Sequence, residues 1–225
     1  MNIQVKEEPV DKTMRRLKKV KISLMRSEMF VMLSGIMMVG NTSLEEDEDV
    51  TAYTNGRDET YGREFVKMLN DKELGFVMVH ENFHKMYQHP IIWKKLWDID
   101  HDCCNLACDH VINLQITDID PNETLIAFPR DKDGKRMGAY DTRFKNMYTK
   151  QVFDILMKEK KKGGGKGEGP GGFDKHGFEE AKGMSKEEKQ ELEREIDQAI
   201  RQGKIAQEKL CGKGKGGGAF DLGEL

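Results

Sequence analysis

Residues 70–90 read NDKELGFVMVHENFHKMYQHP, and this stretch decides the fold. Either of its first two residues can cap a helix, and the run of apolar residues at 74–79 gives that helix a side to bury. Pro90 is expected to end the helix near His89, because proline disfavours helical backbone in the residue before it. The stretch therefore predicts one helix whose apolar side chains are buried and whose histidines face a cleft.

Residues 80–84 of this helix form the pattern HExxH. His80 and His84 are four positions apart, so both imidazoles lie on one face of the helix and can meet one Zn²⁺ ion. From the position after the first histidine, the carboxylate of Glu81 can take a proton from a water whose pKa zinc lowers toward ~7. The pattern predicts zinc-dependent hydrolysis with Glu81 as the general base. A plainer interpretation is two hydrogen-bonded histidines on a partly buried helix.

The third ligand of this zinc ion is predicted to be Asp109. A hydrolytic zinc usually has three protein ligands and one water. Asn105, Asp109 and Asn113 recur every four residues on a helix that is otherwise apolar. A buried polar stripe needs partners, and a metal ion with two asparagines hydrogen-bonding around it would supply them.

His89 is the second choice for the third ligand. On a continuing helix it would be rotated ~900° from His80 and would point away from the metal. No glycine lies between His84 and His89 to ease a sharp reversal of the chain. One alternative stays open: Asp109 orients a ligand histidine, and His89 or a water takes the third place.

The rest of the chain predicts an α+β fold that is mostly helical, with a small sheet beside the active helix. A strand is expected at 51–57, entering a turn at Asn55-Gly56, and a second one at 125–128. Residues 44–50 are acidic and are expected to form a loop. Helices are predicted over residues 13–38, 61–69, 102–114, 149–158 and 185–209, and a turn over 118–122.

The composition changes at Lys160, which suggests a division into three parts. Residues 13–158 are predicted to form the catalytic domain. Residues 159–184 are predicted to be a flexible linker, since 160–172 is rich in glycine and lysine. Residues 185–225 begin with a capping box, Ser185 to Glu188, and are predicted to form one helix and a low-complexity tail.

Bulk composition limits the class of protein. The chain has 225 residues and a net charge of only −3, which gives no argument for binding nucleic acid. The most apolar run, 29–39, is too short to span a bilayer, which takes about 20 residues. The first residues are polar and predict no signal peptide. Three of the 4 cysteines lie within six positions, a poor disulfide framework. A soluble, cytoplasmic protein is expected.

Other candidate chemistry is weaker. His101, Cys103, Cys104 and Cys108 could form a second zinc site, but they lack the CxxC spacing, and small core residues are the favoured interpretation. An oxyanion could be held by a tyrosine hydroxyl, and nothing in the sequence selects among Tyr53, Tyr61 and Tyr87.

Four stretches resemble a known family. They are TAYTNGR at 51–57, EFV at 64–66, HENFHKMYQHP at 80–90 and NLACDHVIN at 105–113. They are similar to segments of the zinc metallopeptidase domain that precedes a von Willebrand A-like domain in bacterial and phage proteins. The resemblance covers roughly residues 15–158. It implies a zincin-like active helix, peptide or protein substrates, and a bound zinc ion.

The chain also departs from this family. The residues after Pro90 read IIWKK where the family often has arginines, and Cys108 replaces a residue that is usually alanine-like. The resemblance places a von Willebrand A-like part after Leu225, either missing, encoded separately or cut away. It therefore implies a protein partner of that type. The alternative function is a non-catalytic zinc-containing interaction or assembly module that works with such a partner.

Overall fold

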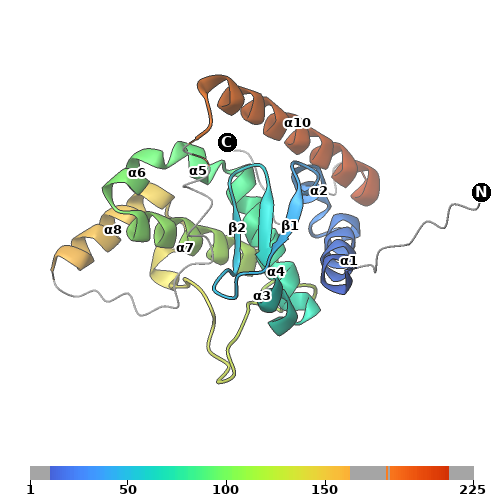
Figure 1. Ribbon diagram of the computed structural model, residues 1–225, viewed down its shortest axis with the longest axis horizontal. Coiled ribbons are helices and arrows are strands. Elements are labelled where there is room, and N and C mark those ends of the chain that lie inside the picture. Colours follow the sequence, from blue (N-terminus) through green and yellow to red (C-terminus); the bar gives the residue numbers. More distant parts are fainter. Residues whose placement is uncertain (1–10, 163–180, 182, 213–225) are drawn as a thin grey trace, which may run out of the picture.

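The computed structural model describes residues 11–162, 181 and 183–212. It confirms an α+β fold that is mostly helical with one small sheet (Figure 1). The elements in chain order are α1 (Lys12–Arg26), η1 (Val31–Leu33), α2 (Ser34–Met37), β1 (Thr42–Glu45), β2 (Ala52–Thr54), β3 (Glu59–Gly62), α3 (Arg63–Met68), α4 (Asp71–Met86), α5 (His89–Ile92), α6 (Lys94–Ile99), α7 (His101–Ile119), η2 (Thr142–Phe144), α8 (Thr149–Lys161) and α10 (Lys186–Cys211).

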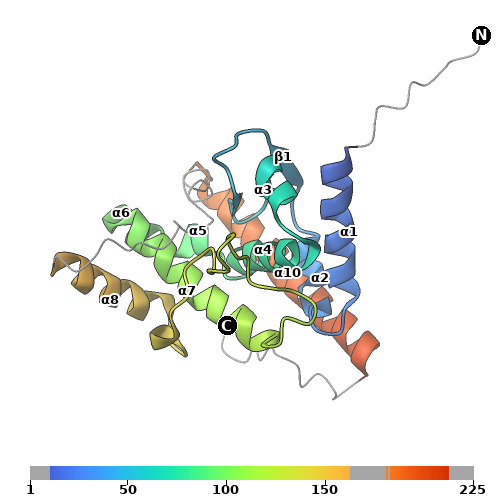
Figure 2. The same ribbon diagram turned by 90° about the horizontal axis from the view of Figure 1, so that it is seen from below.

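Helix α4 occupies the centre of the fold, with α1 on one side and α7 on the other (Figure 2). The predicted cap is confirmed: the side chain of Asn70 accepts the N–H groups of Lys72 and Glu73, and the Glu73 carboxylate accepts the N–H of Asn70. Every residue from Leu74 to Met86 is buried, including the polar ones. Helix α4 is therefore enclosed by protein along most of its length, and its polar side chains need partners inside the molecule.

The sheet has the strand order β1-β3-β2 and lies against α4 through β2. Strand β3 pairs in parallel with β1, where Tyr61 lies opposite Leu44, and antiparallel with β2, where Tyr61 lies opposite Ala52. The predicted strand and its turn are confirmed, with Gly56 at a φ of 94°. The predicted loop at 44–50 is wrong at its start, because pairing with β3 makes Thr42–Glu45 a strand.

Three other predictions of secondary structure are wrong in part. Residues 13–38 do not form one helix: Ser27 is extended, and its hydroxyl donates to the carbonyl of Leu24, which ends α1. The helix predicted at 61–69 begins later, since residues 59–62 belong to β3. Residues 125–128 form no strand, because the carboxylate of Asp120 accepts the N–H groups of residues 124–126.

Helix α7 is longer than predicted at both ends. It runs from His101 to Ile119, so it includes the start of the turn expected at 118–122. The side chain of Asp100 caps it by accepting the N–H of Cys103. Within the described part of the chain, no helix is long and apolar enough to cross a membrane.

The C-terminal helix α10 packs onto the domain, across the top of the view in Figure 1. Its predicted capping box is present, and Leu192, Ile196 and Ala199 join the main hydrophobic core. Two glycines set the contact with α2 and η1. A Cβ at Gly35 would lie 2.0 Å from the carbonyl oxygen of Ala199, and one at Gly203 would lie 1.9 Å from that of Met32. The predicted linker falls largely on residues outside the described ranges.

We expect Gly203→Ala to destabilise the protein by about 1–3 kcal/mol, because the new methyl group overlaps the backbone of η1. In an exposed helix the same change stabilises by roughly 1 kcal/mol, so the sign of the effect is informative. Urea unfolding measures it, with Gln202→Ala, at the exposed neighbouring position, as the control. A gain in stability for Gly203→Ala would contradict the close contact.

Candidate metal centre

Helices α4 and α7 bring together the three residues that the sequence selected as metal ligands. Nε2 of His80 and Nε2 of His84 are 3.0 Å apart. Oδ1 of Asp109 lies 3.5 Å from the first of these nitrogens and 3.3 Å from the second. All three side chains have 0% exposure. The three ligand atoms thus form a nearly equilateral triangle inside the protein, between two helices.

The size of this triangle fits one metal ion. Ligand atoms about 2.0 Å from a tetrahedral ion are about 3.3 Å from one another, and the three separations lie around that value. Both carboxylate oxygens of Asp109 are buried, and apart from the imidazoles facing Oδ1 they have no hydrogen-bond partner among the described residues. A buried carboxylate in that position is costly unless a cation compensates it. The residues present therefore fit a bound metal ion.

Asn113 fixes which nitrogen of His80 faces the centre. The amide nitrogen of Asn113 donates to the carbonyl of Ala139 at 2.9 Å, which turns Oδ1 of Asn113 toward His80. That oxygen lies 2.8 Å from Nδ1 of His80 and accepts a hydrogen bond from its N–H. Nε2 of His80 then keeps its lone pair for a metal. The predicted hydrogen bond from Asn113 is confirmed, whereas Oδ1 of Asn105 is buried without a partner among the described residues.

Glu81 lies beside these ligands on α4 and also has 0% exposure. Its charge is one of the causes that raise the pKa of Tyr61, after burial and the charge of Glu59. The carboxylate of Glu81 is therefore within electrostatic range of the hydroxyl on β3. The candidate base and the candidate ligands occupy the same enclosed part of the molecule.

His89 does not point away from His84, so the expectation based on a continuing helix is wrong. Gln88 adopts the left-handed conformation, with φ 51° and ψ 35°, and α4 has already ended at Met86. The reversal needs no glycine and leaves His89 buried, with its Nδ1 3.2 Å from Nδ1 of His84. His89 thus approaches the outer nitrogen of His84, on the other side of the ring from the Nε2 atom that faces Asp109.

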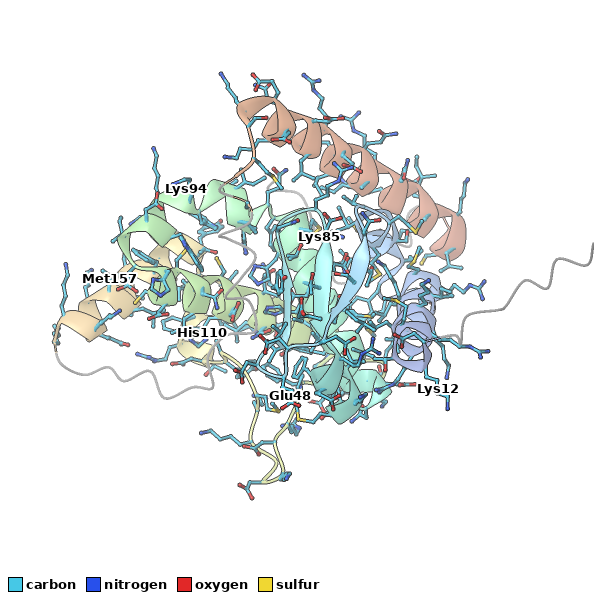
Figure 3. The ribbon with its side chains drawn as sticks, viewed as in Figure 1. Lys12, Glu48, Lys85, Lys94, His110 and Met157 are labelled. Carbon is cyan, nitrogen blue, oxygen red and sulfur yellow. The ribbon has the colours of Figure 1, made fainter. Side chains whose placement is uncertain are left out.

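A buried ion pair next to the centre was missed by the sequence analysis. Nζ of Lys85 donates to Oε1 of Glu59 at 2.6 Å and to the carbonyl of Val39 at 2.7 Å. Tyr61 donates its hydroxyl to the other oxygen of Glu59 at 2.9 Å. Figure 3 shows Lys85 beside the strands. The only signal in the sequence was a lysine within a helix predicted to be buried, and its partner on β3 depends on the tertiary fold.

The three candidate tyrosines are placed differently. Tyr61 is buried and its hydroxyl is committed to Glu59, while Tyr87 donates to Oε1 of Gln115 at 2.9 Å. Burial raises the pKa of Tyr87 to about 12. Tyr53 lies partly exposed on β2, between two buried residues. The structure places neither the Tyr61 nor the Tyr87 hydroxyl in a hydrogen bond with the metal centre.

The three cysteines of α7 lie in a second hydrophobic cluster, formed with α6 and α8. Cys103, Cys104 and Cys108 are free and buried, and burial raises the pKa of Cys103 to about 11. Among the described residues, the group of metal-ligating side chains that converges is the one around Asp109. The interpretation of these cysteines as core residues agrees with their burial.

These features define a class: a helical α+β domain whose central helix carries HExxH beside a buried His-His-Asp centre. The chain belongs to the family described as a putative metallopeptidase domain, which it matches over residues 33–225. Neither the curated proteins nor the solved structures give a match.

We expect Lys85→Met to destabilise the protein by up to about 3–5 kcal/mol, because it removes the cation in direct contact with the buried Glu59 and leaves only Lys21, whose Nζ lies 3.7 Å from Oε1 of Glu59. The double variant Lys85→Met, Glu59→Gln removes both charges and should lose less than the two single changes together. Urea unfolding of the four proteins gives the coupling, and Lys95→Met, at an exposed position, is the control. Additive losses would contradict a direct interaction.

The second prediction from this site concerns the stability of the protein at low pH. Burial lowers the pKa of His84 to about 4 from the ordinary 6.5, although hydrogen bonding to Asp109 acts in the opposite direction. Burial and the charge of His84 also lower the pKa of His89. The unfolded chain therefore binds these protons more readily, and stability is lost as the pH falls from 6.5 toward 4.

Urea unfolding of the protein freed of metal by a chelator, from pH 4.5 to 7.5, measures this loss. His84 alone should contribute on the order of 3 kcal/mol. His84→Asn should flatten the profile, and the control His101→Gln, which changes an exposed histidine, should leave it as steep as in the unmodified protein. Equal stability at the two ends of this pH range would show that folding does not lower the pKa of these histidines.

Proposed function

We propose that this protein is a zinc-dependent peptidase that hydrolyses peptide bonds at the centre between α4 and α7. The observation that carries the proposal is the triangle of Nε2 of His80, Nε2 of His84 and Oδ1 of Asp109, with a buried Glu81 directly after His80 on the same helix. Membership of the metallopeptidase family supports the same reaction class.

Zinc is the ion that this donor set favours. Two imidazole nitrogens and one carboxylate oxygen in a tetrahedral arrangement suit Zn²⁺, whereas Mg²⁺ and Ca²⁺ prefer oxygen ligands in larger number. Three protein ligands leave one position for water or substrate, as in hydrolytic sites. A purely structural zinc site usually has four protein ligands and has no use for a neighbouring glutamate.

In the proposed hydrolysis the residues of the centre have different roles. A bound zinc ion supplies Lewis acidity toward a carbonyl oxygen and toward water. Glu81 accepts the proton of the attacking water and returns it to the nitrogen of the leaving amine. Asn113 holds His80 in the tautomer that presents Nε2 to the centre. Enclosure between the helices excludes bulk water, which strengthens each of these electrostatic interactions.

One observation favours a second function. Glu81 and the three candidate ligands all have 0% exposure, so the centre is closed in this conformation. A peptidase needs a movement that admits its substrate. A non-catalytic zinc module that assembles with a von Willebrand A-like partner needs none, and the enclosure of the centre supports this alternative.

Metal analysis and Glu81→Gln distinguish the two functions. The purified protein is expected to hold about one zinc ion, and the His80→Ala, His84→Ala double variant is expected to hold none. Glu81→Gln keeps the shape and removes the base, so hydrolysis of a peptide library should fall by roughly 10²–10⁴-fold while zinc stays bound.

Glu191→Gln, at an exposed position of α10, is the matched control and should hydrolyse the library like the unmodified protein. Equal hydrolysis by the unmodified protein and Glu81→Gln would assign the activity to another source. Zinc binding without any hydrolysis would favour the assembly module.

A further inference from the structure

We propose that His89 is the positioning residue of the metal centre, because it accepts a hydrogen bond from Nδ1 of His84 and thereby aims Nε2 of His84 at the metal ion. The inference rests on the metal site of the proposed function. It goes beyond that function by assigning a role to a buried histidine outside the ligand triangle.

The two nitrogens of His84 face in different directions. Nε2 lies 3.0 Å from Nε2 of His80, inside the triangle, and Nδ1 lies 3.2 Å from Nδ1 of His89, outside it. A metal ligand uses the lone pair of Nε2, so the proton of a neutral His84 is on Nδ1. His84 is then the donor, and Nδ1 of His89 is the acceptor.

The ring of His89 is held in place for this contact. It lies edge-on to the ring of His84, at an interplanar angle of 84°, and stacks on the ring of Tyr87 at 28°. The hydroxyl of Tyr87 donates to Gln115 on α7, which ties the stack to the second helix of the centre. His89 is 3% exposed, so water does not compete for its Nδ1.

The backbone before His89 is strained, and this placement explains the strain. Gln88 has a positive φ, which costs a residue with a side chain roughly 1–3 kcal/mol and persists where the surroundings impose it. Its carbonyl accepts the N–H groups of Ile91 and Ile92, and Pro90 fits the first turn of α5. The result is an abrupt reversal that returns His89 to the helix it has just left.

His80, the other candidate histidine ligand, is oriented in the same way. Nδ1 of His80 is held by Asn113 from α7, and Nδ1 of His84 is held by His89 from α5. Partners of this kind fix the tautomer and the orientation of a ligand imidazole, and their loss typically lowers metal affinity by 10–100-fold. His89 therefore belongs to the shell around the ligands, and Asp109 belongs to the ligand set.

Two substitutions separate hydrogen bonding from packing. His89→Phe keeps a ring against Tyr87 and removes the acceptor, whereas His89→Asn offers a carboxamide oxygen close to the position of Nδ1. Zinc affinity is measured by competition with a chelator, and the fold by urea unfolding. We expect His89→Phe to bind about one zinc with roughly 10–100-fold lower affinity, and His89→Asn to recover most of that loss.

His101→Phe, at an exposed histidine, should bind zinc like the unmodified protein. A loss in His89→Phe as large as that in His84→Ala would make His89 a ligand and overturn the inference. Equal affinities in His89→Phe and the unmodified protein, or equal losses in the Phe and Asn variants, would also overturn it. Zinc binding that follows the expected pattern without hydrolysis would overturn the peptidase alone, and no zinc binding at all would overturn both.

Discussion

Burial of α4 is the constraint on which the rest of the structure depends. A helix enclosed from Leu74 to Met86 cannot leave its two histidines, its glutamate and its lysine to be solvated by water. Each buried polar group must be compensated inside the protein, because an isolated buried charge costs several kcal/mol. The elements around α4 must therefore supply partners for its buried polar groups as well as pack against it.

The compensation comes from two sides. Strand β3 supplies Glu59, which neutralises Lys85, and helix α7 supplies Asp109 and Asn113, which face the histidines. Consecutive residues of one helix thus serve different purposes: His84 faces the metal centre, and Lys85 ties the helix to the sheet. The ion pair therefore joins the helix that carries the candidate ligands to the sheet.

The sequence predicted those features that leave a regular spacing of residues along a helix. The cap at Asn70, the HExxH pair and the polar stripe that ends at Asn113 all follow from spacing along a helix, and the structure shows the cap and the convergence of Asp109 with the histidines. Pairings between elements that leave no such spacing were not predicted. Strand β1 exists because it pairs with β3, and the partner of Lys85 lies 26 positions earlier in the chain.

The position of His89 shows a different limit. From the sequence, His89 was placed by helix rotation, which holds only if the helix continues to that residue. Glycine was also taken as the residue that would ease a reversal of the chain. Gln88 instead takes a conformation that local preference disfavours, and only the contacts of the folded state make it the best choice. Local rules fail most readily where tertiary contacts impose strain, and in this chain that point lies next to the candidate site.

The close contact of α10 with α2 and η1 has a consequence for the order in which the chain folds. The candidate metal centre is assembled from residues 80–109, which are all synthesised before α10, so its contacts do not wait for that helix. The core around Met32 and Gly35, in contrast, closes only against residues 199–203. During synthesis this part of the core stays open until α10 has left the ribosome, so α2 and η1 emerge long before the helix that completes their contacts.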